Sequence, residues 1–304
     1  MQMSLLAYNR SLVKLVESRI ERFVDEYKPR YIYVYFSGGK DSSAVLAAST
    51  NCCPEKVVAV YNHIVGQTHR LNVEAVIGVV KKLGLEIRRI VPRNPENLRI
   101  TLLQDPPRPG QLLYLVVRSY RYGLPYWDAV KKWGFPVPSE RARNGVRWCC
   151  SEYKEKWWYM LPPNGVHRGR TVKYNVVGIK RSDSPHRAKT WRTMINIYDS
   201  KSMVTLAPLY DLSDNDVWSL LRSYDLYDIV KKQYDVMGES PNCTLCPLMP
   251  LHILEKAVTK LPTSYLEMVR DTIEKYGVRG SVSEYKVSKW IEIIDKELER
   301  RSRQ

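Results

Sequence analysis

Short apolar runs alternate with amphipathic stretches in the first third of the chain. The runs at 31–36, 56–61 and 85–91 have the length of strands and are rich in Val, Ile and Tyr. Between them, 41–49 and 71–84 place apolar residues at helical spacing. Strands that alternate with helices are typical of a parallel sheet, because parallel strands need a crossover connection between them.

The rest of the chain shows three kinds of pattern. Residues 4–27 predict a leading helix, and 172–179 and 203–209 predict two further strands. Residues 92–165 are rich in Pro, Arg and Trp and poorly periodic, so we expect helices and loops there rather than strands. From residue 213 onward the periodicity is helical.

These patterns predict an α/β fold: a parallel, Rossmann-like sheet with helices on both faces and a helical C-terminal region. We expect an N-terminal helix at 1–27, a nucleotide-binding α/β domain at 28–212, and a helical region at 213–304 that carries a Cys-x-x-Cys pair. Ligands of such sheets bind at the carboxyl ends of the strands. The segment that follows the strand at 31–36 is therefore the first place to look for a site.

That segment, SGGKDSS at 37–43, has the residues of an anion site. Its two glycines allow the backbone to approach a ligand, and a helix that begins near Asp41 directs unpaired N–H groups at the same place. Lys40 adds a compact positive charge, and Asp41 suits a helix cap or a Mg²⁺ ligand. The spacing is not that of a Walker motif, and a turn that only joins strand to helix is the alternative. The predicted contacts are Ser37, Gly38, Gly39, Lys40, Asp41, Ser42 and Ser43, with Lys40 and Asp41 as the candidate catalytic residues.

The charge balance narrows the choice of partners. The chain has 48 Lys and Arg against 32 Asp and Glu, a net charge of +16, which favours polyanions such as nucleotides, RNA or DNA. A thermophile's charged surface is the alternative explanation. No apolar run reaches the roughly 18 residues of a membrane span, and no signal peptide is recognisable. We therefore expect a cytoplasmic protein with no membrane partner.

The six cysteines occur as three close pairs, which in a cytoplasmic chain favours metal or redox chemistry over structural disulfides. Cys149 and Cys150, with Cys243 and Cys246, offer four thiolates, a set that suits zinc or an iron–sulfur cluster. Adjacent cysteines are awkward for a zinc knuckle, and two disulfides are a further alternative. Cys52 and Cys53 are interpreted as small buried side chains.

The motif SGGKDS after an apolar strand resembles the pyrophosphate loop of the adenine-nucleotide alpha-hydrolase superfamily, also called the PP-loop ATP pyrophosphatases. This resemblance implies that the chain binds ATP with Mg²⁺. It also implies that ATP is cleaved between its alpha and beta phosphates, which gives pyrophosphate and an adenylated substrate.

Later segments resemble the phosphoadenylyl-sulfate (PAPS) reductase family within that superfamily. They are the segment ending in RWCC, the segment VVGIKRSDSPHRAK at 176–189, and LAPLYDLSDNDVWSLL at 206–221. The stretch after the second strand departs from the family pattern at Gly66 and Gln67. The resemblance implies nucleotide contacts from Gly178, Lys180, Asp183, Ser184 and Arg187.

The arrangement CC…CxxC resembles the 4Fe-4S site of adenylyl-sulfate (APS) reductases. This implies that Cys149, Cys150, Cys243 and Cys246 hold such a cluster, with zinc as the second choice.

Two departures bear on the reaction. Reductases of this family use a cysteine near the C-terminus, whereas this sequence has none after Cys246, and an intact SGGKDS with Lys40 suits ATP better than APS or PAPS. The resulting hypothesis is an ATP pyrophosphatase that adenylates an acceptor, tRNA or DNA, for sulfur transfer from a sulfur-donor protein. The alternatives are an APS or PAPS reductase that uses an external thiol, such as a thioredoxin-like reductant, and a non-catalytic subunit that binds nucleotide and cluster. An oligomer is compatible with each.

Overall fold

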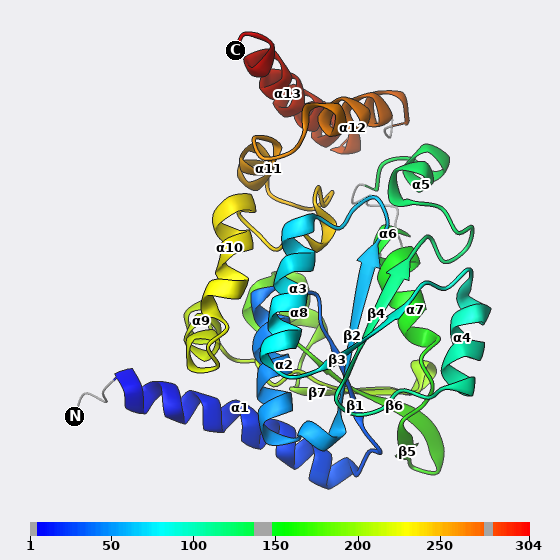
Figure 1. Ribbon diagram of the computed structural model, residues 1–304, viewed down its shortest axis with the longest axis vertical. Helices are drawn as coiled ribbons and strands as arrows, with labels where there is room; N and C mark the ends of the chain where they lie inside the picture. The colour runs from blue at the N-terminus through cyan, green and yellow to red at the C-terminus, as the bar shows by residue number, and fades with distance from the viewer. Residues whose placement is uncertain (1–4, 137–147, 277–281) are drawn as a thin grey trace.

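The computed structural model describes residues 5–136, 148–276 and 282–304 and shows a mostly parallel sheet with helices on both sides (Figure 1). Within those ranges the strands have the order β3-β4-β2-β1-β6-β8-β7, and β5 pairs with β6 outside this path. Their bounds are β1 Ile32–Tyr35, β2 Val57–Ile64, β3 Glu86–Ile90, β4 Gln111–Val117, β5 Gly165–His167, β6 Arg170–Val177, β7 Ile195–Tyr198 and β8 Met203–Leu206. The predicted α/β class with a parallel sheet is confirmed.

Helices precede, connect and follow these strands. They are α1 Leu5–Tyr27, α2 Lys40–Cys52, α3 Arg70–Lys82, α4 Pro95–Gln104, α5 Tyr126–Trp133, α6 Trp148–Cys150, α7 Lys156–Tyr159, α8 Pro185–Thr190, α9 Asp214–Ser223, α10 Tyr227–Met237, α11 Leu251–Val258, α12 Thr263–Tyr276 and α13 Val282–Ser302. A π-helical turn at Ser151–Glu155 joins α6 to α7, and single 3₁₀ turns lie at 54–56, 181–183, 199–201 and 241–243. The helical C-terminal region is confirmed, and its last helices lie together at one end of the molecule (Figure 1). None of the described helices combines the length and the apolar composition that a membrane crossing requires.

Strand β1 occupies the centre of the sheet and is buried on both faces. Ile32 and Val34 pack into one cluster with α1, α2 and α9, whereas Tyr33 and Tyr35 pack into a second cluster with α5 and α11 to α13. A parallel strand covered on both faces needs apolar side chains at every position. This requirement explains why the segment is an unbroken apolar run rather than an alternating one.

The order of the strands changes direction next to β1. The strand pairs in parallel with β2 on one side and with β6 on the other, so Tyr33 lies beside both Val58 and Asn175. The chain passes from β1 through α2 to β2, whereas β6 belongs to the other half of the sheet, with β7 and β8. Their carboxyl ends therefore flank the kind of crevice in which open α/β sheets bind ligands.

The expectation that 92–165 has no strand is wrong. β4 lies inside the sheet between β2 and β3 and pairs in parallel with both, with Leu113 beside Val60 and Arg88. The run LLYLVV that forms β4 is almost entirely buried, so it has no alternation to distinguish it from a helical segment. The strands β5 and β7, both antiparallel to their neighbours, were not predicted either.

The glycine turn depends on a close approach between β6 and α2. A Cβ atom at Gly178, directly after β6, would lie 2.6 Å from the carbonyl carbon of Asp41 and 2.7 Å from the backbone nitrogen of Ser42. Both contacts are with backbone, so neither neighbour can yield by changing rotamer. Gly178 thus lets the end of β6 lie directly against the first turn of α2.

Gly178→Ala should therefore destabilise the fold by about 1–3 kcal/mol, the usual cost of overpacking, and should also weaken nucleotide binding because the first turn of α2 is displaced. Thermal unfolding and nucleotide titration measure the two effects. Gly84→Ala is the matched control, since a Cβ there meets no atom within 4 Å and only the backbone φ of +70° is unfavourable. Equal nucleotide affinity in the Gly178 variant and the wild type would contradict this account.

Candidate functional site

The glycine turn is shaped by side chains that hold its carbonyl groups. The Asn72 amide donates to Ser37 O at 3.0 Å, the Gln233 amide donates to Gly38 O, and Ser42 Oγ donates to Gly39 O at 3.1 Å. Gly38 has a φ of +78°, and a Cβ there would lie 2.7 Å from both Asn72 and Val76. With these carbonyls held inward, the N–H groups of Gly38 and Gly39 donate to no acceptor among the described residues.

The first turn of α2 adds further donors. The N–H of Lys40 donates to Tyr234 Oη at 3.0 Å and that of Ser43 to Gly39 O, which leaves the N–H groups of Asp41 and Ser42 without an acceptor in the described chain. The helix cap predicted for Asp41 is wrong, because Gly39 is the N-cap and no side chain caps the helix. The turn is thus an uncapped helix N-terminus beside two glycines, an arrangement that attracts anions.

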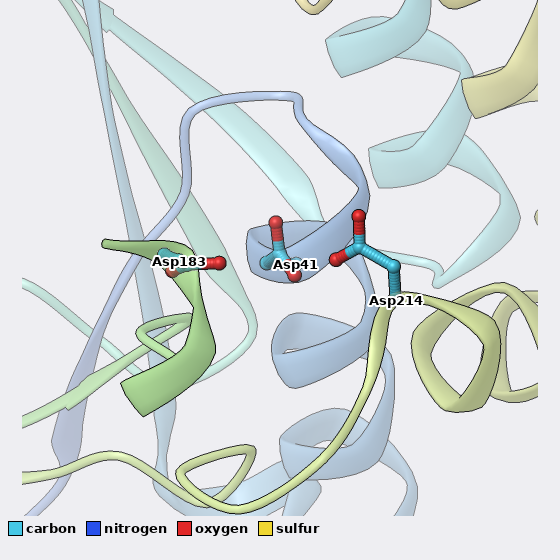
Figure 2. Close-up of side chains that lie close together, drawn as sticks. All are labelled: Asp41, Asp183 and Asp214. Atoms are coloured by element: carbon cyan, nitrogen blue, oxygen red, sulfur yellow. The ribbon is translucent and has the colours of Figure 1, made fainter. Parts of the chain in front are cut away.

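Three aspartates from distant parts of the chain converge beside this turn (Figure 2). Asp41 lies in α2, Asp183 follows β6, and Asp214 is the first residue of α9; one oxygen of each lies within 4.8 Å of the others. Lys180, only 1% exposed, places its Nζ against all three carboxylates, 2.7 Å from Asp183 and 3.1 Å from Asp214. Its ammonium group therefore occupies the centre of the three carboxylates.

Lys40 and Arg187 complete this group of ions. Lys40 Nζ lies 3.1 Å from Asp41 and 3.3 Å from Asp214, and Arg187 pairs with Asp183. The three carboxylates are thus balanced by three cations. Burial raises the pKa of Asp183, but the hydrogen bond and charge of Lys180 outweigh burial and hold that pKa below its usual value. Burial likewise lowers the pKa of Lys180, while Asp41 and Asp183 raise it to a net value above the ordinary one.

The remaining predicted contacts lie at different distances from the turn. Gly178 and Arg187 line the same cavity as Ser37 and Ser42. Ser184 instead caps α8, where its Oγ accepts from the N–H of Arg187. Ser43 is fully buried on the inner side of α2, outside the residues that line the cavity.

The cavity at the carboxyl ends of β1, β2 and β6 has a volume of about 560 Å³. Ser37 and Ser42 line one part of it, and the four predicted metal ligands line another: Cys149, Cys150, Cys243 and Cys246. The glycine turn and the two cysteine pairs, more than a hundred residues apart in sequence, therefore open into one space. The stacked rings of Tyr35 and Trp158, with centroids 4.1 Å apart, form part of the cavity wall.

One residue near the end of β2 connects the two cysteine segments, through its side chain on one side and its backbone carbonyl on the other. Asn62 Nδ2 donates to the carbonyl of Tyr153 at 3.0 Å, three residues after Cys150, and Asn62 O accepts from the Asn242 amide at 3.2 Å, next to Cys243. Both bonds are buried, so neither can be exchanged for water without cost.

The turn after β2 holds the Cys-x-x-Cys loop more fully. Gln67 O accepts from both the N–H and the hydroxyl of Thr244, and the Gln67 amide donates to Leu245 O at 2.9 Å. Thr68 Oγ1 donates to Asn242 O at 3.1 Å. Gln67, which departs from the family pattern in sequence, is therefore a clamp between the turn and the second cysteine pair.

Two polar groups face the cysteines. Burial lowers the pKa of Lys154, but Cys243, Cys150 and Cys246 outweigh burial, and Lys154 hydrogen-bonds to Cys243 with a pKa above its ordinary value. Tyr126 is 2% exposed, and its Oη has no hydrogen-bond partner among the described residues. Burial, and then the negative charge of all four cysteines, raises its pKa. The ammonium group of Lys154 and the hydroxyl of Tyr126 thus lie near the four sulfur atoms.

Sequence reasoning missed several of these residues. Asp214 lies in the segment LSDNDVW, in which the family resemblance points to the Asp-Val-Trp at 216–218 and not to Asp214. Lys154 comes one helical turn after Cys150, a spacing that could have identified it. Tyr126 and Tyr234 carried no signal, because a buried tyrosine is indistinguishable from core in a sequence.

The third cysteine pair lies elsewhere. Cys52 ends α2, and Cys53, 6% exposed, packs in the cluster beneath α1 and α2, with the two Sγ atoms 3.0 Å apart. The interpretation as a small buried side chain therefore holds for Cys53, whereas Cys52 is only partly buried.

The sequence matches no protein family and no curated protein. Among solved structures, the chain is similar to phosphoadenylyl-sulfate reductase from Candida auris in a phosphate complex, at 11% identity and a TM-score of 0.38, covering 74% of this chain and 89% of that one. It is also similar to the NH3-dependent NAD synthetase from Campylobacter jejuni subsp. jejuni in complex with nitrate, at 13% identity and a TM-score of 0.41, covering 99% and 96%. Both are named for enzymatic activities.

The ion group leads to a prediction about stability. Lys180→Met should cost on the order of 3 kcal/mol at pH 7, because three carboxylates lose their central cation. The pKa values of Asp183 and Asp214 are lowered by the lysines, so their contribution is present above the unfolded values and is lost as pH falls through the folded ones. The difference between variant and wild type should therefore shrink below about pH 4. Denaturant titrations across this range measure it, with Lys189→Met on α8 as the control, and a loss that is independent of pH would contradict it.

Proposed function

We propose that this chain is an ATP pyrophosphatase that transfers an adenylyl group to an acceptor for sulfur transfer, with a 4Fe-4S cluster beside the nucleotide. One observation carries this proposal: Ser37 and Ser42, at the two ends of the glycine turn, line the same cavity of about 560 Å³ as the four cysteines. A phosphate site and a thiolate site that merely coexisted in one protein would have no reason to share a space. Sharing it suits a reaction in which both act on one substrate.

The turn supplies the phosphate contacts. The unpaired N–H groups of Gly38 and Gly39 and the first turn of α2 suit the beta and gamma phosphates. Lys40, Lys180 and Arg187 are each engaged by a carboxylate, so arriving phosphates would exchange with Asp41, Asp183 and Asp214 for these cations. The carboxylates released in this exchange are the oxygen ligands that Mg²⁺ prefers. Anionic phosphates and a divalent cation thus enter together with little change in net charge.

The same donors suit cleavage at the alpha phosphorus. As the bond to the beta phosphate breaks, negative charge grows on the departing pyrophosphate, where fixed N–H groups and ammonium groups stabilise it most. Acceptor oxygen attacks the alpha phosphorus, pyrophosphate leaves, and a sulfur donor then displaces AMP. No described side chain is assigned as the base that receives the acceptor's proton.

The cysteine site fits a 4Fe-4S cluster. Cys149, Cys150, Cys243 and Cys246 would be the ligands, and Lys154 and the unpaired hydroxyl of Tyr126 would donate to the cluster's sulfur atoms. A bound cluster would supply an electron reservoir and a binding place for sulfur. Cys149 and Cys150 are adjacent, whereas the ligand pairs of structural zinc sites are normally separated by two to four residues, so we propose the cluster ahead of zinc.

Lys40→Ala should abolish pyrophosphate release, with a loss of about 10²- to 10³-fold, because an ammonium group at the leaving phosphates is removed. The assay incubates anaerobically purified protein with ATP, APS or PAPS and identifies AMP, pyrophosphate, ADP and sulfite. Lys14→Ala on the exposed face of α1 is the control. Unchanged pyrophosphate release in the Lys40 variant, or sulfite formed from APS or PAPS without ATP, would reject the proposal.

Cys149→Ser and Cys246→Ser should each lose most of the bound iron and sulfide after anaerobic purification, because each removes one of four ligands. Cys52→Ser changes a cysteine at the far end of α2 and should keep both. Iron and acid-labile sulfide analyses, with the visible absorption spectrum, measure the outcome. Full iron content in both ligand variants would show that the cysteines hold no cluster.

A further inference from the structure

Three connected hollows run along the face of the sheet that carries α4 and α7. The first, about 260 Å³, lies beneath 118–123, and the central one, about 690 Å³, lies between α4 and the start of β6. The last, about 270 Å³, lies at the starts of β6 and β8. The central hollow shares Asn94, Pro95 and Tyr120 with the first and Val172 and Ser202 with the last. We call the three together the basic groove.

The groove concentrates positive charge that the protein itself does not neutralise. Seven arginines and lysines line it against two carboxylates, Glu96 and Asp199. Of the seven, Arg99 alone forms an ion pair within the described ranges, with Glu96 at 3.7 Å. Some basic residues on helices outside the groove are paired, as Arg70 is with Glu74.

Lys173 shows the cost of this arrangement. Its ammonium group is partly buried and, within the described part of the chain, donates only to the carbonyl of Tyr159, at 3.0 Å. Burial lowers the pKa of Lys173 to about 8. A phosphate in the central hollow would supply the anion that Lys173 lacks.

Each hollow also exposes one large apolar side chain. Tyr122 is 49% exposed in the first, Leu103 60% in the central one and Ile197 41% in the last. Lys201 links the last two, with its Nζ 5.6 Å from the ring of Tyr159 and 5.9 Å from that of Tyr198. A double helix offers phosphates but hides its bases, whereas a single strand offers both to such a surface.

We propose that the basic groove binds single-stranded nucleic acid, with phosphates on its arginines and lysines and bases on its exposed rings and apolar side chains. The groove and the cavity meet at α7, because Trp158 lines the cavity and the next residue, Tyr159, lines the central hollow. That the bound strand is also the acceptor rests on the proposed function; the binding itself does not.

The test measures fluorescence anisotropy of labelled 12-nucleotide RNA and DNA, and of the matching duplexes, without ATP and over a range of salt. Arg121→Ala combined with Arg170→Ala removes one exposed cation from each end of the groove. The slope of log affinity against log salt should fall by about 1.4, since each phosphate contact of a single strand contributes about 0.7. Tyr122→Leu should weaken single-strand binding by about 5- to 150-fold. Stronger binding to RNA or to DNA identifies which strand is preferred.

The matched control is Lys81→Ala with Lys260→Ala, two exposed lysines outside the groove that carry the same change in charge. It should keep the wild-type slope. An equal fall in slope in the control, tighter binding to the duplex, or no binding to either strand would overturn the proposal. The proposal would also be overturned if polyglutamate or anionic lipid vesicles bound the protein as tightly as single-stranded nucleic acid does and lost affinity in the same groove variants.

The two proposals fail separately. Strand binding that depends on the groove, together with no pyrophosphate release from ATP, rejects the proposed function alone. Pyrophosphate release with strand binding that ignores the groove variants rejects the groove alone.

Discussion

The parallel pairing of β1 with β2 on one side and β6 on the other is the constraint on which the rest of the structure depends. It places the carboxyl ends of three central strands at one edge of the sheet. The strand that follows β1 in sequence, β2, lies on one side of β1, and β6 lies on the other. Every candidate group then reaches that edge by a short segment. The glycine turn follows β1, the clamp for the Cys-x-x-Cys loop follows β2, and Lys180 follows β6.

Electrostatic balance is the second requirement of this edge. Three carboxylates and three cations lie within a few ångströms of one another. Each cation is of a type that suits a phosphate, and it is paired with an aspartate of a type that suits a metal ion. The group depends most on Lys180, its one fully buried member, because removing that charge leaves three neighbouring carboxylates without their shared cation. Pairing with the aspartates thus holds Lys40, Lys180 and Arg187 in position beside the glycine turn.

The sequence predicted those parts of the fold and site that are local. The unbroken apolar run of β1, the glycine turn and the start of α2 lie within one short stretch, so their pattern was sufficient. β4 was not predicted, because a strand buried on both faces shows no alternation of polar and apolar residues and the Pro-rich segments around it suggested loops. Asp214 and Tyr126 were not predicted as site residues for a different reason. Each acts on residues far away in sequence, and nothing in one sequence reports that proximity.

The bond between Asn62 and both cysteine segments has a consequence for how the protein matures. The four sulfur atoms come from segments 93 positions apart, and their common anchor becomes complete only after the chain has been made beyond residue 246 and α10 has docked against α3. Contacts of such long sequence separation form slowly, because loop closure must precede them. We therefore expect the four cysteines to come together late in folding, on a nearly complete scaffold.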